Sequence, residues 1–258
     1  MLVVRSVVGL ATVQDLGRPG FVSHAVPRGG ALVPALARRA NAAAGNADEA
    51  ACVEVFGKLA LVAEAACVVA TEEGARELHA GDALVVDPDP RARVRYVALG
   101  GGVDAPVVLG SRSTLVVAGI GRPLRAGDRV VAAGARGPAR EPPRFEREGP
   151  IALVPGPDDP DAAALLAPTW RLAPASDRTG TRLDGPPLAF ARDLRKSSPM
   201  VPGAVQVPSG GAPIVIGPDG PTTGGYPIVA VVVRADLDRF HALPVGASVA
   251  FEVRAHPR

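Results

Sequence analysis

The chain has 258 residues, enough for one large domain or two smaller ones, and its formal charge of +2 is small. This balance, without clusters of Lys and Arg among aromatic residues, argues against a nucleic-acid partner. No apolar run approaches the roughly 18 residues of a membrane helix, and the N-terminus lacks the pattern of a signal peptide. We therefore expect a soluble, cytoplasmic protein with no membrane partner.

Short runs rich in Val, Ile and Leu recur along the chain, and Gly, Pro or Asp separates nearly all of them. Abundant Gly and Pro without a repeat period are typical of turns between short strands. The pattern predicts a mostly β protein with strands at 2–8, 59–62, 67–70, 83–86, 93–98, 107–109, 129–132, 151–154, 214–216, 228–233 and 248–253.

Three short helices are predicted between these strands. Residues 34–44 are mostly good helix formers, with Pro at the first position and Gly45 and Asn46 as a stop signal. Residues 158–166 begin with acidic side chains, which suit a helix N-terminus, and residues 236–242 form the third.

A polar, proline-rich stretch at 134–150 has no apolar periodicity, which is the composition of a linker. It predicts two β-rich lobes, an N-terminal one of residues 1–140 and a C-terminal one of residues 141–258.

Several kinds of chemistry lack their motifs in this sequence. Gly57-Lys58 has Cys52 where a P-loop needs its first Gly, so no nucleotide loop is predicted. The four histidines form no pair at metal-binding spacing and have no Cys-x-x-Cys near them, which predicts no metal site. Neither Lys58 nor Lys196 lies beside a Met, so we expect no covalent biotin on this chain. Cys52 and Cys67, each between Ala and Val, are typical of buried, reduced thiols.

Three polar clusters lie among Gly and Pro, where a backbone can approach a ligand closely. The first brings an amide, two guanidinium groups and an imidazole into about one loop through Gln14, Arg18, His24 and Arg28. The alternative is that Asp15 and Arg18 simply pair and pin the loop.

The second cluster is a run of hydroxyl groups around an arginine, Ser111-Arg112-Ser113, followed by Thr114. Such a turn can hold a carboxylate or a phosphate through the guanidinium and backbone N–H groups. Equally, the hydroxyl groups can satisfy the loop's own backbone.

The third cluster is the richest and predicts a polar pocket for a small ligand that forms hydrogen bonds. Its candidate side chains are Asp177, Arg178, Arg182, Gln206, Asp219, Thr222, Thr223 and Tyr226. In the alternative interpretation, Asp177 and Asp184 only pair with the arginines.

Six phrases together resemble the biotin-dependent carboxyltransferase family, in order and over nearly the whole chain. They are Gln-Asp-Leu-Gly-Arg-Pro-Gly (14–20), Ala-Asn-x-x-x-Gly-Asn (40–46), Leu-Gly-Ser-Arg-Ser-Thr (109–114), Ser-Asp-Arg-x-Gly-x-Arg-Leu-x-Gly (176–185), Pro-Gly-Ala-Val-Gln-Val-Pro (202–208) and Thr-Thr-Gly-Gly-Tyr-Pro (222–227). The family includes one of the subunits of bacterial 5-oxoprolinase and the second carboxyltransferase half of urea amidolyase.

The resemblance implies a cyclophilin-like β-barrel architecture and a role within an ATP-dependent 5-oxoprolinase, which opens 5-oxo-L-proline to L-glutamate. ATP and two partners, the kinase-inhibitor-like B subunit and the A subunit of that enzyme, are implied with it. Two alternatives stay open. One is the carboxyltransferase component of a biotin-dependent urea or amide carboxylase, and the other is a non-catalytic regulator that binds a kinase-inhibitor-like partner.

In the leading interpretation a small lactam is held by Arg178, Arg182 and Gln206. The Thr222, Thr223 and Tyr226 side chains add hydrogen bonds to it, and Asp177 or Asp219 is the candidate base.

The sequence departs from the family pattern at three positions. Gly29 replaces a usual Ser, Val33 a usual Asp, and Ser198 a frequent acidic residue. The N-terminal cluster thereby loses a polar pair, whereas the C-terminal cluster stays nearly intact.

Overall fold

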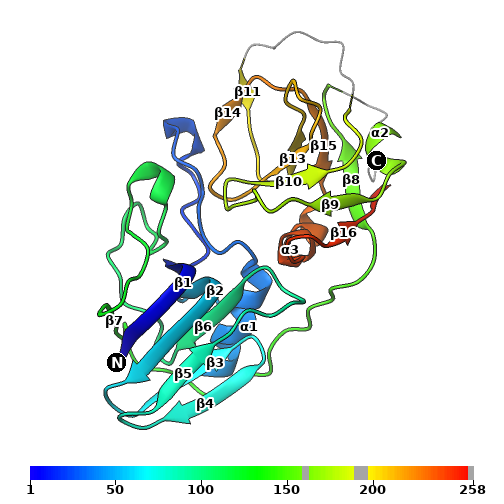
Figure 1. Ribbon diagram of the computed structural model, residues 1–258. Helices are drawn as coiled ribbons and strands as arrows, with labels where there is room; N and C mark the ends of the chain where they lie inside the picture. The colour runs from blue at the N-terminus through cyan, green and yellow to red at the C-terminus, as the bar shows by residue number, and fades with distance from the viewer. Residues whose placement is uncertain (159–162, 189–196, 255–258) are drawn as a thin grey trace. The chain divides into compact units, whose positions relative to one another are not determined.

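The computed structural model describes residues 1–158, 163–188 and 197–254. The chain divides into two compact units, the first made of Met1–Pro19 and Gly29–Phe145 and the second of Gly20–Arg28 and Glu146–Arg258. Both units are built mainly of strands, which confirms the predicted mostly β class (Figure 1).

In its described part, the first unit has a sheet of seven strands, paired antiparallel in the order β4-β3-β6-β2-β1-β7, with β5 beside β2. The strands are β1 (Leu2–Gln14), β2 (Cys52–Ala63), β3 (Cys67–Thr71), β4 (Gly74–Leu78), β5 (Ala83–Val86), β6 (Arg95–Leu99) and β7 (Arg129–Val130). The long β1–β2 pair forms its centre, and aliphatic side chains from nearly every strand form the core.

Helix α1 (Pro34–Ala44) has the predicted bounds and packs on β6 and β3 (Figure 1). Pro34 suits the first turn, where no intrahelical partner for an N–H exists. The helix ends in a Schellman motif, because Gly45 adopts φ 76° and its N–H bonds to Ala42 O while Asn46 N–H bonds to Asn41 O.

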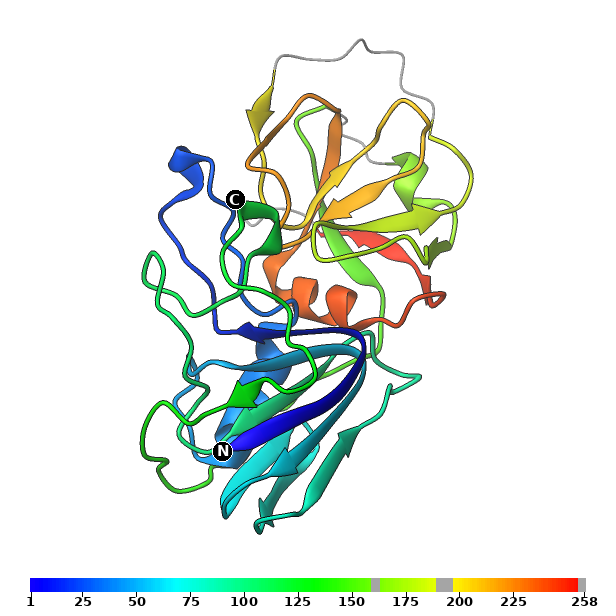
Figure 2. The same ribbon diagram turned by 60° about the vertical axis from the view of Figure 1, so that its left-hand side comes forward.

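The second unit contains a sheet that nearly closes into a barrel. Its described strands have the order β16-β9-β10-β13-β12-β15-β8-β17. Their bounds are β8 (Ile151–Pro155), β9 (Trp170–Leu172), β10 (Gly180–Asp184), β12 (Ala204–Gln206), β13 (Ile214–Ile216), β15 (Ile228–Val232), β16 (Ser248–Val249) and β17 (Phe251–Val253). The two edge strands, β16 and β17, are separated in sequence by Ala250 alone, so the chain itself bridges the opening (Figure 2).

Large apolar side chains fill the barrel, among them Trp170, Phe240 and Phe251. The Trp170 indole N–H donates to Leu165 O over 2.9 Å, as expected for a buried indole. The remaining elements of the chain are α2 (Ala163–Leu166), α3 (Arg234–Ala242), the two-stranded ribbon of β11 (Ser198–Pro199) and β14 (Thr223–Gly224), and the 3-10 turns η1 (Val22–His24) and η2 (Val116–Ala118).

Some predicted elements differ from the structure. The strand predicted at residues 107–109 is instead one side of a tight turn, with a single bridge between Val108 and Ser111. The predicted helix at 158–166 is described only as α2, because residues 159–162 lie outside the described part. Helix α3 begins at Arg234, two residues before the predicted start.

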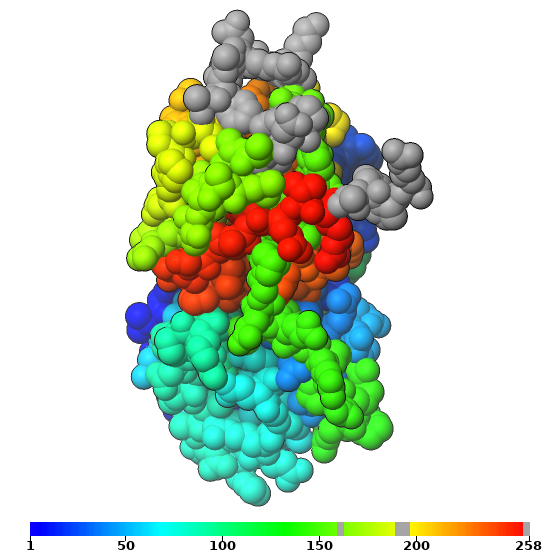
Figure 3. Space-filling model, turned by 90° about the vertical axis from the view of Figure 1, so that its right-hand side faces the viewer, coloured from blue at the N-terminus to red at the C-terminus, as the bar shows by residue number. Residues whose placement is uncertain are grey.

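Part of the proline-rich segment at residues 134–150 is bonded to the first unit. Gly137 N–H bonds to Gly45 O, and Arg140 N–H bonds to Ala42 O. The Arg39 guanidinium donates to Pro143 O. Figure 3 shows the segment, in green, on the molecular surface. Its composition predicts a linker, but part of it is attached along the C-terminal half of α1.

Candidate functional site

The first two polar clusters meet in the first unit around the carboxylate of Asp15. It accepts hydrogen bonds from Gly17 N (2.7 Å), Ser111 Oγ (2.6 Å), Arg112 N (2.6 Å) and Ser113 Oγ. In return, Asp15 N donates to Ser113 Oγ over 2.9 Å. The two loops, almost 100 residues apart in sequence, are therefore joined by one carboxylate.

Arg18 and Gln14 strengthen the same junction. The Arg18 guanidinium is fully buried and donates to Val108 O (3.4 Å) and Ser113 O. The buried Gln14 amide donates to Thr114 O over 3.0 Å. Both side chains donate to main-chain carbonyls of the second loop, which favours a structural role for Gln14 and Arg18 over ligand binding.

Among the described residues, the side chains of the other predicted members of these clusters make no hydrogen bond to Asp15. The Arg112 side chain extends to Asp104, with 2.8 Å between Nη1 and Oδ1, and to a neighbouring main-chain carbonyl. His24 is exposed, with Nδ1 3.3 Å from Ser23 Oγ, and Arg28 is half-buried. Since His24 and Arg28 belong to the second unit, the predicted first cluster is divided between the two units.

The departures from the family pattern have local structural consequences. Val33, at the position where Asp was expected, occupies the N-cap of α1 without a side-chain cap and is fully buried. Gly29 adopts φ 62°, a region that favours glycine over serine. At position 33 the chain thus has buried apolar packing in place of a residue type that can cap a helix.

A role for Glu54, a buried acid that contacts the backbone just before α1, was not predicted from the sequence. Glu54 is fully buried and accepts hydrogen bonds from Leu32 N and from the Tyr96 hydroxyl, each over 2.7 Å. The Tyr96 hydroxyl in turn accepts from Val33 N over 2.9 Å. Burial, followed by the charge of Glu54, raises the pKa of Tyr96 well above its usual value. The only sequence signal was a Glu inside an otherwise apolar strand, Cys-Val-Glu-Val-Phe.

The two thiols should differ in reactivity. Burial, and then the charges of Glu54, Asp15 and Glu72, raise the pKa of Cys52. Burial also raises the pKa of Cys67, which is half-buried. A raised pKa lowers the thiolate fraction at a given pH, so alkylation should speed up as pH rises.

We expect iodoacetamide at pH 8 to label Cys67 slowly and Cys52 only after unfolding, as measured by peptide mass spectrometry. Equal labelling of both in the native protein would contradict this burial pattern.

In the second unit, two predicted site residues pair with each other. Arg178 Nε and Nη2 donate to the two carboxylate oxygens of Asp219 over 2.8 and 2.7 Å, and both side chains are buried. Gly217 lies against Arg178 O, so the two turns are also close in their backbones. A carboxylate engaged at both oxygens by a guanidinium favours a structural role for this pair over proton abstraction by Asp219.

Asp177 and Arg182 flank this pair. The Asp177 carboxylate caps its own turn by accepting from Thr179 N (2.7 Å) and Gly180 N (3.1 Å). Arg182 lies exposed on β10, directly opposite Ile214 of β13, which in turn lies opposite Gln206 of β12. Side chains in such a row share one face of the sheet, so Arg182 and Gln206 are about 10 Å apart across two strand spacings.

Gln206 has the environment of a ligand-binding side chain. It is 6% exposed, and its amide lies against Gly224 of β14 in a small apolar cluster that includes Met200 and Ile228. In the described part of the chain, its side-chain amide makes no hydrogen bond. The amide is not among the fully buried polar atoms that lack a partner, so it is available to a ligand from solvent.

The Thr-Thr-Gly-Gly-Tyr turn reaches this amide through Gly224. Within β14, Thr223 is exposed. Beside the strand, Thr222 is half-buried and Tyr226 is 40% exposed. Ser198, where an acid was expected, pairs with Gly224 across the ribbon. Of the predicted C-terminal cluster, Arg182, Thr223 and Tyr226 are thus exposed, whereas Arg178 and Asp219 are buried against each other.

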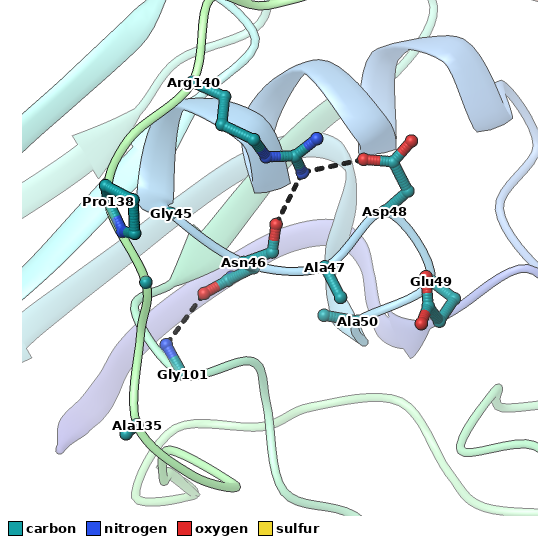
Figure 4. Close-up of a pocket in the computed structure, with 11 residues that line it drawn as sticks. Gly45, Asn46, Ala47, Asp48, Glu49, Ala50, Gly101, Ala135, Pro138 and Arg140 are labelled. Atoms are coloured by element: carbon teal, nitrogen blue, oxygen red, sulfur yellow. Dashed lines mark hydrogen bonds and ion pairs between the residues drawn. The ribbon is translucent and has the colours of Figure 1, made fainter.

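A pocket of about 680 Å³ in the first unit lies beside the C-terminus of α1 (Figure 4). Two of its polar lining residues, Asn46 and Arg140, are held by hydrogen bonds within the chain. The Asn46 amide bonds to Asn41 Oδ1, Leu99 O and Gly101 N, and Arg140 donates to Asp48 Oδ1 and Asn46 O, each over 2.7 Å. These bonds explain the Ala-Asn-x-x-x-Gly-Asn phrase as a structural turn.

Among the described residues, no three His, Cys, Asp or Glu side chains come together as a metal-binding group. Within the same residues, no helix has both the length and the apolar character needed to cross a membrane.

Several known proteins are similar to this chain. The chain is 33% identical to the C subunit of 5-oxoprolinase from Escherichia coli, over 93% of this chain and 87% of that protein. The crystal structure of the protein TTHA0988 matches with a TM-score of 0.88 and 30% identity, and covers 97% of this chain. The Kluyveromyces lactis urea carboxylase structure matches with a TM-score of 0.86 and 25% identity over the same share.

The matched portions of these solved structures are parts of longer chains. This chain corresponds to 55% of the TTHA0988 chain and to 27% of the urea carboxylase chain. The family model for the carboxyltransferase domain, subdomains A and B, matches residues 24–253. The resemblance predicted from the six phrases is thus confirmed, and the chain belongs to the carboxyltransferase-domain family, together with the C subunit of 5-oxoprolinase and urea amidolyase.

Proposed function

We propose that this chain is the C subunit of an ATP-dependent 5-oxoprolinase, which acts with the B and A subunits to open 5-oxo-L-proline to L-glutamate. The observation that supports this most is the extent of the matches. The bacterial relatives named as C subunits of 5-oxoprolinase, from Escherichia coli and Haemophilus influenzae, align over 87% and 91% of their own length. The urea amidolyase of Lachancea kluyveri aligns over only 16%.

The chemistry of lactam opening fits the face of the barrel that carries Gln206. The amide carbonyl must be activated, and charge develops on its oxygen as the ring opens, so N–H donors and a cation near that oxygen are useful. The Gln206 amide supplies a donor, the Arg182 guanidinium supplies a cation on the same face, and Tyr226 adds an exposed hydroxyl. In this proposal the chain binds and orients the lactam, while ATP is used together with the partner subunits.

The test is glutamate release from 5-oxoproline and ATP by this chain alone, with the B subunit, and with the B and A subunits together. We expect turnover only in the complete mixture. If the three proteins form a stable complex without turnover, 5-oxoproline is removed as the substrate and the regulatory role gains support.

Replacement of Gln206 by Leu should separate function from stability. The variant removes an amide that has no hydrogen bond in the described chain, so the free energy of unfolding should stay equal or rise slightly. The kcat/KM of the complex should fall at least about tenfold, because a hydrogen bond to the substrate is lost.

Ser209→Ala, an exposed change in the following turn, is the matched control and should leave both quantities unchanged. A Gln206→Leu enzyme with normal kcat/KM would remove this face of the barrel as the substrate site.

The second candidate is the carboxyltransferase component of a biotin-dependent urea or amide carboxylase. The similarity to the urea carboxylase structure along 97% of the chain favours it. In this case the chain accepts carboxybiotin from a carrier on another chain. Transfer of ¹⁴C-carboxylate from free carboxybiotin to urea, in the absence of the A and B subunits, would support this candidate over the first.

A further inference from the structure

Two hairpins that follow β6 display exposed aliphatic side chains. The first turns at Leu109 and Gly110, closed by hydrogen bonds in both directions between Val108 and Ser111. The second is closed by the pair Leu115 and Ile120. We name the exposed tips the hairpin-tip surface, which consists of Val107 (59% exposed), Val108 (37%), Leu109 (41%), Val116 (52%) and Val117 (61%).

The tip of the first hairpin carries a residue type that the backbone disfavours. Leu109 adopts φ 52° and the following Gly110 adopts φ 76°. Gly, Asn or Asp normally fills the first of these two positions, since a Leu in the left-handed region costs about 1 kcal/mol. Leu109 is thus an exposed apolar side chain at a position where Gly, Asn or Asp would stabilise the chain better. This points to a contact between Leu109 and another molecule.

The Asp15 junction holds both hairpins in place. Ser111 and Ser113 lie between the two tips and bond to the Asp15 carboxylate, and Arg18 donates to Val108 O at the base of the first tip. Because the loops are anchored by buried, charge-assisted bonds, their tips are ordered before any partner binds. A pre-ordered surface loses little conformational entropy on association.

We propose that the hairpin-tip surface is the docking site for the B subunit of the same complex. This inference rests on the proposed function. Two observations identify the occupant as a protein chain. The bacterial relatives are named as subunits, so they assemble with other chains. In TTHA0988, just over half of the chain corresponds to this protein, so further polypeptide accompanies the domain there. The chemistry that fits five branched aliphatic side chains is an apolar protein surface.

The experiment measures binding of the purified B subunit by this chain, using calorimetry, with Val107→Asp and Val117→Asp as separate variants. Val85→Asp is the matched control, because Val85 is an exposed valine (48%) on β5 of the same unit, outside the two hairpins. Each hairpin variant should weaken binding at least tenfold, and the control should bind like the wild type. Circular dichroism melts check that all three variants remain folded.

Two outcomes overturn the proposal. Wild-type affinity in both hairpin variants removes the hairpin-tip surface as the docking site, whatever the activity of the complex. Self-association of the wild type that both variants abolish, without binding of the B subunit, assigns the surface to a second copy of this chain. Turnover of 5-oxoproline by the wild-type mixture is scored separately, so a failure of the proposed function is distinguishable from a failure of the surface.

Discussion

Replacement of Asp15 by Ala should lower the free energy of unfolding of the first unit by about 3–5 kcal/mol. The Asp15 carboxylate accepts hydrogen bonds from Gly17 N, Ser111 Oγ, Arg112 N and Ser113 Oγ. Each bond to a charged acceptor contributes about 1.5–3 kcal/mol, and part of this is recovered when water replaces the carboxylate. The loss should appear as denaturant-dependent labelling of Cys52, which is fully buried in the first unit and reports on its opening.

Asp104→Ala is the control for the Asp15 variant. Asp104 also bonds to Arg112, but this ion pair is largely exposed, so its removal should cost less than about 1 kcal/mol. Equal losses in the two variants would mean that the Asp15 junction does not hold the loops. The Asp15→Ala variant should also bind the B subunit more weakly, because its hairpin tips are no longer held in place.

The junction shows where prediction from sequence reached its limit. The residue types in both loops indicate polar clusters. The alternative for the first is an Asp15–Arg18 pair, and for the second it is hydroxyl groups that satisfy the loop's own backbone. Asp15 and Ser111 are 96 positions apart, however, and nothing in the local pattern indicates that one carboxylate joins them. Such a contact depends on the pairing of whole strands, which local propensity does not specify.

Local signals were sufficient where a local cause determines the structure. The predicted bounds of α1 are correct because Pro34 begins it and Gly45 permits the left-handed C-terminal turn. In contrast, the apolar run at 107–109 suggests a strand, but the chain turns there through Leu109 at positive φ. No propensity rule anticipates a leucine in that conformation.

The strand β10 escapes prediction for a different reason. Its sequence Gly-Thr-Arg-Leu-Asp is rich in polar residues and is typical of a binding loop. Yet burial alternates along it, with Thr181 and Leu183 buried and Arg182 and Asp184 exposed, which is the period of a strand. This alternation places Arg182 on the same face of the sheet as Gln206. The candidate site therefore depends on β10 being a strand and not a loop.

Replacement of Gly9 or Gly57 by Ala should lower the free energy of unfolding of the first unit by about 3–5 kcal/mol. The two glycines lie opposite each other in the long β1–β2 pair and adopt φ values of 98° and 104°. A Cβ on Gly9 would lie 2.2 Å from Phe56 O, and one on Gly57 would lie 2.2 Å from Val8 O. Both obstacles are backbone atoms of the partner strand, so the strands themselves must separate to relieve the overlap.

Gly81→Ala separates the cost of the overlap from the cost of the backbone conformation. Gly81 adopts φ 92°, close to that of Gly9, but a Cβ there meets nothing within 4 Å. Its replacement should therefore cost only the conformational strain, about 1–2 kcal/mol, measured by Cys52 labelling in denaturant. A Gly9→Ala loss no larger than that of Gly81→Ala would show that β1 and β2 can part locally at this point. A larger loss would show that the contact of the added Cβ with the backbone of the partner strand, and not the positive φ alone, is what requires glycine at these two positions.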